Sequence, residues 1–141
     1  MLITFLDQYS YLGGGQIILI SLIKSLEKNN KINVIFPRGG SLEKKIKNLQ
    51  NKNIFLYGIN ENEFKYEKKS FLNSLILIKN NFLVFGKYFH VLKSSDLIYC
   101  NAPRLFLICV LASIFLNKKI NYHIHSRYNL IESILISFIS Q

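Results

Sequence analysis

Short apolar runs alternate along this chain with segments in which apolar residues recur every three or four positions. The short runs are typical of buried strands, and the periodic segments are typical of amphipathic helices. The predicted strands cover residues 1–6, 32–37, 53–57, 96–100 and 120–125. The predicted helices cover residues 16–28, a segment capped by Ser41, residues 71–92 as one helix or a pair, residues 103–116 and residues 130–140. This alternation predicts an α/β, Rossmann-like three-layer sandwich with a mostly parallel sheet and right-handed crossovers.

The first strand and the first helix are joined through three consecutive glycines, Gly13, Gly14 and Gly15. Glycine allows positive φ angles and lets another molecule approach the backbone closely. The start of a helix also presents free N–H groups and the positive end of its dipole. The junction is therefore a candidate site for a phosphate or a sugar, although an ordinary tight turn accounts for the same glycines.

Several loops with polar and basic residues follow the predicted strands. In open parallel sheets, ligands bind beyond the carboxyl ends of the strands. This rule brings residues 7–15, 38–41, 101–104 and 125–127 to one edge of the sheet. All three arginines of the chain lie in these loops, and a guanidinium group suits phosphate or carboxylate. Arginines also occur anywhere on a protein surface, and three is a small sample.

Two common α/β nucleotide sites are disfavoured by the same region. A dinucleotide site needs G-x-G-x-x-G and an acidic residue after the second strand. This chain has GGGQII instead, and its second strand ends in Pro37 and Arg38. A phosphate-loop nucleotide hydrolase needs G-K-[ST] after the glycines, and the chain lacks it. His123 and His125 point the same way on a strand, but no acidic or cysteine ligand lies near them in sequence, so no metal is expected.

Composition narrows the class further. The chain has 141 residues, 50% of them hydrophobic, which is enough for one domain with a real core. Its net charge of +10 suits an anionic membrane or substrate, although a lysine excess is also typical of AT-rich coding. With few arginines and no recognisable module, nucleic acid is not an expected partner. Cys100 and Cys109 are predicted to be buried free thiols, which places the protein in the cytoplasm.

An apolar stripe at helical spacing runs through the segment between the third and fourth strands. Its members are Phe71, Leu75, Ile78, Phe82, Phe85, Phe89 and Leu92. We expect this stripe to pack on the sheet, and Asn80 and Asn81 to break the helix near its middle. The lysines around the stripe predict a contact of residues 65–93 with an anionic membrane surface, peripheral at its inner face.

The chain resembles a known family at three stretches. LDQYSYLGGGQIILISLIKSL is similar to the opening of family 4-type glycosyltransferases with the GT-B fold. DLIYCNAPR and KKINYHIHSR are similar to the fourth and fifth strand ends of the same family. The resemblance implies two Rossmann-like domains across a cleft, the first for the acceptor and the second for the nucleotide sugar. It also implies transfer that retains the anomeric configuration, without a bound metal or other cofactor.

The same resemblance implies roles for individual residues. Gly13 to Gly15 would border the phosphates and sugar of the donor, and Gln16 takes the polar position that follows them. His125 matches a histidine near the acceptor hydroxyl and is the catalytic candidate, unless it only bonds a loop carbonyl. The residues implied to bind the acceptor are Asn101, Arg104, Ser126 and Arg127.

In this family the acidic E-x7-E donor motif lies in the C-terminal domain. Residues 1–141 are therefore expected to form a single acceptor-side N-terminal domain, cut short before its last strands. We expect the nucleotide-sugar domain to come from elsewhere, such as a separate chain, and this chain alone not to transfer sugar. The predicted function is the acceptor-binding half of an enzyme that moves a sugar from a nucleotide sugar to a glycan or lipid-linked acceptor, in polysaccharide or glycolipid biosynthesis. The alternative is a non-catalytic α/β module that binds a phosphorylated ligand or a partner protein.

Overall fold

Five parallel strands form the centre of the protein. The computed structural model describes residues 1–49, 51–64 and 71–123. The strands are β1 (Leu2–Leu6), β2 (Lys31–Pro37), β3 (Ile54–Ile59), β4 (Leu97–Cys100) and β5 (Lys119–Tyr122). Their order across the sheet is β3-β2-β1-β4-β5, and every neighbouring pair is parallel. The expected parallel sheet is confirmed, and the helix predicted over 130–140 lies outside the described residues.

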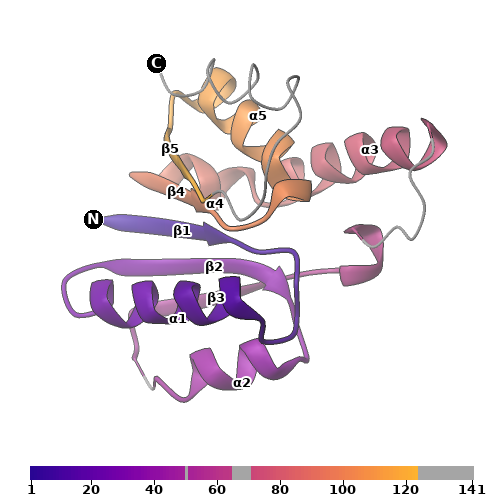
Figure 1. Cartoon of the computed structure of the whole chain (residues 1–141). Coiled ribbons are helices and arrows are strands. Elements are labelled where there is room, and N and C mark those ends of the chain that lie inside the picture. The colour runs from indigo at the N-terminus through magenta and orange to yellow at the C-terminus, as the bar shows by residue number, and fades with distance from the viewer. Residues whose placement is uncertain (50, 65–70, 124–141) are drawn as a thin grey trace.

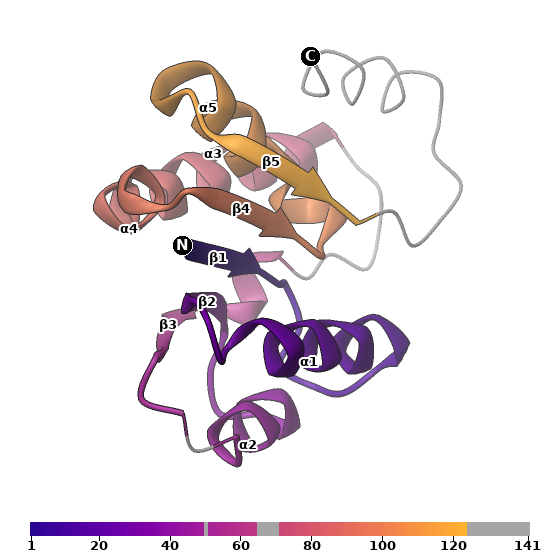
Figure 2. The ribbon, with the colours of Figure 1, turned by 90° about the vertical axis from the view of Figure 1, so that its left-hand side faces the viewer.

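Helices cover the sheet on both sides. They are α1 (Gly14–Leu26), α2 (Ser41–Lys47), α3 (Phe71–Lys87), α4 (Phe89–Ser94) and α5 (Phe106–Leu116), with short 3₁₀ turns η1 (Glu61–Phe64) and η2 (Pro103–Leu105). Figures 1 and 2 show α1 and α2 on one side of the sheet, and α3, α4 and α5 on the other. The three-layer Rossmann-like architecture predicted from the alternating pattern is therefore confirmed.

Each face of the sheet has its own apolar core. Phe5, Val34 and Phe36 pack with residues of α1 and α2, whereas Leu6 and Ile35 pack with residues of α3, α4 and α5. Neighbouring positions on one strand thus face opposite cores, as the alternation of side chains in a strand requires. The inner strands β1 and β2 are buried on both sides, which explains their nearly continuous apolar sequence. Both cysteines are buried and free, as predicted.

The start of α2 differs from the expectation. Gly40, not Ser41, is the N-cap residue, and Ser41 is the first helical residue. The Ser41 hydroxyl instead accepts a hydrogen bond from the backbone N–H of Leu12, 3.0 Å away. The reason is a close backbone approach: a Cβ atom added to Gly40 would lie 2.0 Å from the carbonyl oxygen of Ser10. That same oxygen accepts the N–H of Leu42 at 3.0 Å, so the loop after β1 rests on the start of α2.

The break predicted at Asn80 and Asn81 is wrong. α3 continues through both residues to Lys87, and α4 begins at Phe89. The Asn81 side-chain amide donates to the carbonyl oxygens of Leu77 and Arg104, each at 2.9 Å. The side-chain nitrogen of Asn81 thus has acceptors for both of its N–H groups without interrupting the helix, while its side-chain oxygen has no hydrogen-bond partner among the described residues.

The apolar stripe of this segment packs on the sheet only at its C-terminal end. Leu92 is fully buried, but Phe71, Leu75, Ile78 and Phe82 are 80%, 46%, 45% and 51% exposed. In Figure 1 the N-terminal half of α3 projects past the arrowheads of β1 and β2, where no strand lies beneath it. The prediction that the whole stripe packs on the sheet is therefore wrong for its first half.

Replacing Gly40 by alanine tests the contact between the β1 loop and α2. The added methyl group would meet the backbone of Ser10, so we expect Gly40→Ala to lower the free energy of unfolding by about 1–3 kcal/mol. Urea denaturation measures this loss. Gly86→Ala is the matched control, because a Cβ atom there meets nothing within 4 Å. Equal stability of the two variants would contradict the close approach.

Candidate functional site

The loops that follow β1, β2 and β4 lie together at the carboxyl edge of the sheet. Backbone hydrogen bonds extend the strand pairing one step into these loops: Asp7 N–H donates to Ile35 at 3.0 Å, and Asn101 N–H donates to Leu6 at 2.9 Å. The grouping predicted for residues 7–15, 38–41 and 101–104 is confirmed, and we call these three loops the rim. Residues 125–127, which include His125, Ser126 and Arg127, lie outside the described residues.

A buried carboxylate joins the parts of the rim. Asp7 is fully buried directly after β1. It accepts hydrogen bonds from the backbone N–H of Tyr9 at 2.9 Å and from the Asn101 amide at 2.6 Å. The Gln16 amide on the first turn of α1 donates to both carboxylate oxygens, at 3.1 and 3.0 Å. One side chain therefore ties the end of β1, the start of α1 and the end of β4 to each other.

The environment of Asp7 is costly for a negative charge. Burial raises its pKa above the ordinary aspartate value of 3.8, while the hydrogen bonds from Asn101, Tyr9 and Gln16 act in the opposite direction. Among the described residues, no basic side chain forms an ion pair with it. The amide donors are thus what makes an ionised carboxylate tolerable at this position.

A second set of bonds fixes the loop after β4. Gln8 is buried, and its side-chain oxygen accepts the backbone N–H of Arg104 at 3.0 Å. The Arg104 guanidinium group donates to the carbonyl oxygen of Phe64 in η1, and its own carbonyl oxygen accepts the amide of Asn81. Arg104 therefore connects the rim to the segment before α3.

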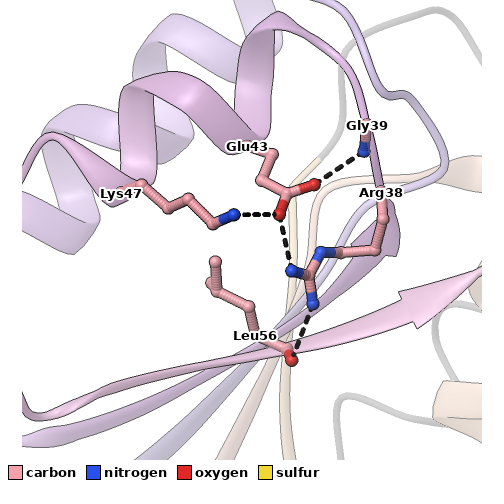
Figure 3. Close-up of polar contacts among 5 residues, drawn as sticks. All are labelled: Arg38, Gly39, Glu43, Lys47 and Leu56. Atoms are coloured by element: carbon pink, nitrogen blue, oxygen red, sulfur yellow. Dashed lines mark hydrogen bonds and ion pairs between the residues drawn. The ribbon is translucent and has the colours of Figure 1, made fainter.

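Arg38, at the end of β2, is part of a compact ion-pair network (Figure 3). Its guanidinium group donates to Glu43 at 2.5 Å and to the carbonyl oxygen of Leu56 at 3.2 Å. Glu43 also accepts the N–H of Gly39 at 2.6 Å and pairs with Lys47 at 2.8 Å. These groups, Arg38 first, lower the pKa of Glu43 to about 2. Arg38 thus holds α2 against β3.

The glycine turn presents the start of α1 at this edge. Gly13 is the N-cap residue, and no side chain of the described chain caps the helix there. A Cβ atom added to Gly14 would meet nothing within 4 Å, whereas one added to Gly13 would lie 3.0 Å from the Gln16 side-chain oxygen. The exposed backbone at Gly14 is therefore the part of the rim that a ligand can reach most directly. Its N–H groups and helix dipole favour an anion.

The predicted site residues differ in how exposed they are in the structure. Gly13, Gly14 and Gly15 lie at the rim surface, but Gln16 and Asn101 are only 5% and 2% exposed and are directed at Asp7. Sequence reasoning missed Asp7 and Gln8 as the groups that hold the rim. The signal for them is a pair of polar residues directly after a strand that is buried on both faces.

His123 directly follows the last residue of β5. Its backbone N–H donates to the carbonyl oxygen of Cys100 at 2.9 Å. Its ring nitrogen Nδ1 shares a hydrogen bond of 2.6 Å with the hydroxyl of Tyr99. This pair extends the polar edge of the sheet from β1 across β4 to β5.

No protein-family model and no curated protein sequence matches the chain. Among solved structures, the chain is similar to HepE of Anabaena in three crystal structures. In complex with UDP, the TM-score is 0.60 and the identity 21%, over 92% of this chain and 30% of the HepE chain. For the complex with UDP-glucose, the TM-score is 0.59 and the identity 22%, over 89% of this chain and 29% of the HepE chain. For the complex with UDP and glucose, the TM-score is 0.56 and the identity 21%, over 88% of this chain and 30% of the HepE chain.

This similarity establishes the fold of the chain. The chain spans about 30% of the length of the HepE chains that it matches. The sequence identity of 21–22% is too low to carry over a ligand or an activity as a finding.

Asn101→Ala tests whether Asp7 depends on its amide donors. The variant leaves one carboxylate oxygen without its shortest hydrogen bond, so we expect a loss of about 2 kcal/mol in the free energy of unfolding. A raised carboxyl pKa means that the folded state loses stability as pH rises above 3.8 through the folded-state pKa. Removing a donor raises that pKa further, so the loss should be larger at about pH 8 than at about pH 4.

Urea denaturation at both pH values measures this difference. Asn121→Ala, at an exposed asparagine of β5, is the matched control and should change stability little at either pH. A loss for Asn101→Ala that is the same at both pH values would contradict the role of Asp7.

The pH dependence of stability also tests the Glu43 network. Its pKa is depressed from 4.5 to about 2, so its contribution is fully present above pH 4.5 and disappears as pH falls toward 2. We expect Glu43→Gln to lose about 1–2 kcal/mol at neutral pH, because the exposed Arg38 and Lys47 partners are screened by solvent. The difference from the parent protein should vanish near pH 2, the folded-state pKa. Parallel stability curves across this range in urea denaturation would refute the pairing.

Proposed function

We propose that this chain is the acceptor-binding half of a GT-B glycosyltransferase of the family 4 type. The enzyme would move a sugar from a nucleotide sugar to a glycan or a lipid-linked acceptor in polysaccharide or glycolipid biosynthesis. The observation that carries the proposal is the uncapped, glycine-lined start of α1 at the carboxyl edge of a parallel sheet. Further support comes from a fold shared with HepE, which has been crystallised with UDP and UDP-glucose.

The proposed donor site uses the backbone of the glycine turn. Gly13, Gly14 and Gly15 would approach the diphosphate and the reacting sugar, and the positive end of the α1 dipole would stabilise the charge that develops on the leaving group. Gln16 would not contact the donor but would hold the first turn of α1 in place, because its amide donates to Asp7. We propose that no metal or other cofactor takes part.

The proposed acceptor site combines the rim loop after β4 with residues 125–127. His125 would bond the acceptor hydroxyl, with Ser126 and Arg127 beside it, and Asn101 and Arg104 would line the opposite side. Because Asn101 donates to Asp7 and Arg104 donates to Phe64, these two residues would shape the acceptor site mainly by holding the loop after β4 in place. Sugar transfer would require a nucleotide-sugar domain, supplied by further sequence or by a separate chain.

We propose a cytoplasmic location, with peripheral contact at the inner face of the membrane through residues 65–93. A lipid-linked acceptor would then be presented at the surface where the enzyme acts. We propose no nucleic-acid partner.

A non-catalytic module that binds a phosphorylated ligand is the second candidate. It is favoured by one observation: the side chains of Gln16 and Asn101 are buried and are used to hold Asp7. A site made mainly of backbone N–H groups suits a phosphate without further chemistry. Such a module would bind inorganic phosphate as well as it binds a nucleotide sugar.

Titration of the ¹⁵N-labelled protein with UDP-glucose tests the proposed function. We expect amide shifts concentrated at Gly13 to Ile17, and Gly14→Ala should weaken the interaction about tenfold, or ~1.4 kcal/mol. Gly86→Ala is the matched control, because an added Cβ atom meets nothing within 4 Å at either glycine. Unchanged binding by Gly14→Ala would refute the donor site, and equal affinity for inorganic phosphate would favour the non-catalytic module.

A further inference from the structure

The projecting half of α3 has its apolar side outward. The large apolar residues exposed on this helix are Phe71, Leu72, Leu75, Ile76, Ile78, Phe82 and Leu83. The side that faces the protein carries the buried amides of Asn80 and Asn81, which are 9% and 1% exposed. A helix on the surface of a globular protein normally has the opposite arrangement. An exposed apolar surface of this extent marks a contact with a partner.

The inward amides fix the rotation of the helix about its axis. The Asn81 amide donates to Leu77 in its own helix and to Arg104 in η2, each at 2.9 Å. Turning α3 to bury its apolar side would break the bond to Arg104 and would bring the charged Lys79 against the protein, which is costly. Val84 and Tyr88, on the same inward side, are buried in the core. The outward apolar side is therefore a fixed feature of the fold.

Charge identifies the kind of partner. From residue 68 to residue 95 the sequence contains lysines but no aspartate or glutamate. Lys79 is exposed on the same side of α3, four residues after Leu75 and three before Phe82. A lysine among apolar side chains can extend its amine to lipid headgroups while its methylene groups stay with the apolar surface. Apolar side chains with flanking lysines and no acidic residues match an anionic bilayer surface.

We propose that the outward side of α3 docks on an anionic lipid bilayer, with Phe71, Leu75, Ile78 and Phe82 inserted at the boundary between headgroups and acyl chains. Among the described residues, no helix has the length and apolarity to cross a membrane. α3 projects past the carboxyl edge of the sheet (Figure 1), so docking would hold the rim close to the bilayer. The inference deepens the proposed membrane contact and rests on it, but it does not require sugar transfer.

Flotation with lipid vesicles tests the docking. We compare phosphatidylcholine vesicles with vesicles in which about a third of the lipid is phosphatidylglycerol. The protein should float only with the anionic vesicles. The double variant Leu75→Gln, Phe82→Gln should bind about tenfold more weakly, because it removes apolar side chains from the inserted side. Lys79→Gln should weaken binding less, and Lys24→Gln, on the exposed side of α1, should not change it.

The matched control replaces exposed apolar residues elsewhere. Ile114 and Phe115 of α5 are 69% and 68% exposed, so Ile114→Gln, Phe115→Gln removes comparable apolar surface from a different helix. All of the variants should keep the stability of the parent protein in urea denaturation, since the altered side chains are exposed. Equal loss of vesicle binding in the α5 control, or equal binding to neutral vesicles, would overturn the proposal.

A second copy of this chain is the competing occupant of the α3 side. Light scattering that shows a dimer, lost in the Leu75→Gln, Phe82→Gln variant, together with no flotation, would overturn membrane docking. The variant should also give the same UDP-glucose amide shifts as the parent protein. Failure of flotation is therefore distinguishable from failure of the donor site.

Discussion

The rim depends on one buried carboxylate and its amide donors. Asp7 stands where β1 ends, and its bonds to Gln16 and Asn101 set the positions of α1 and of the loop after β4. Because the carboxylate is desolvated, the loss of any one donor leaves a charge with too few partners. Because the buried carboxylate needs all of its donors in place, it restricts the rim loops to one arrangement more strictly than apolar packing does. The glycine turn is consequently held at the surface, where Gly14 is exposed.

The proposed surfaces meet at the same end of the molecule. The rim carries the exposed backbone at Gly14, and the apolar half of α3 projects beyond the same edge of the sheet (Figure 1). Arg104 and Asn81 connect the two, since Asn81 on α3 donates to the carbonyl oxygen of Arg104 in η2. An enzyme that takes a sugar from a soluble donor and gives it to a lipid-linked acceptor needs this proximity between its cleft and a membrane surface.

Much of the fold could be predicted from the sequence because local patterns determine it. Apolar runs buried on both faces indicate parallel strands, and the carboxyl-edge rule located the rim loops. The partners of Asp7 were not predictable, because Gln16 and Asn101 lie 9 and 94 positions away and no local pattern links them to it. The spacing of apolar residues in α3 predicted an apolar side of the helix, but not whether that side faces the protein or the solvent. The rotation of the helix depends on the partners of Asn81 in the tertiary structure. The expected roles of His125, Ser126 and Arg127 concern residues outside those described, so they stay predictions.

The most direct measurement of the central claim is an NMR titration of the Asp7 carboxyl carbon. We expect a midpoint above the ordinary value of 3.8, because burial outweighs the hydrogen bonds from neutral donors. The side-chain amide signals of Gln16 and Asn101 should shift with the same midpoint, since both groups donate to this carboxylate. Amide signals of Gln16 and Asn101 that do not follow the titration of the Asp7 carboxyl carbon would contradict a rim built on Asp7.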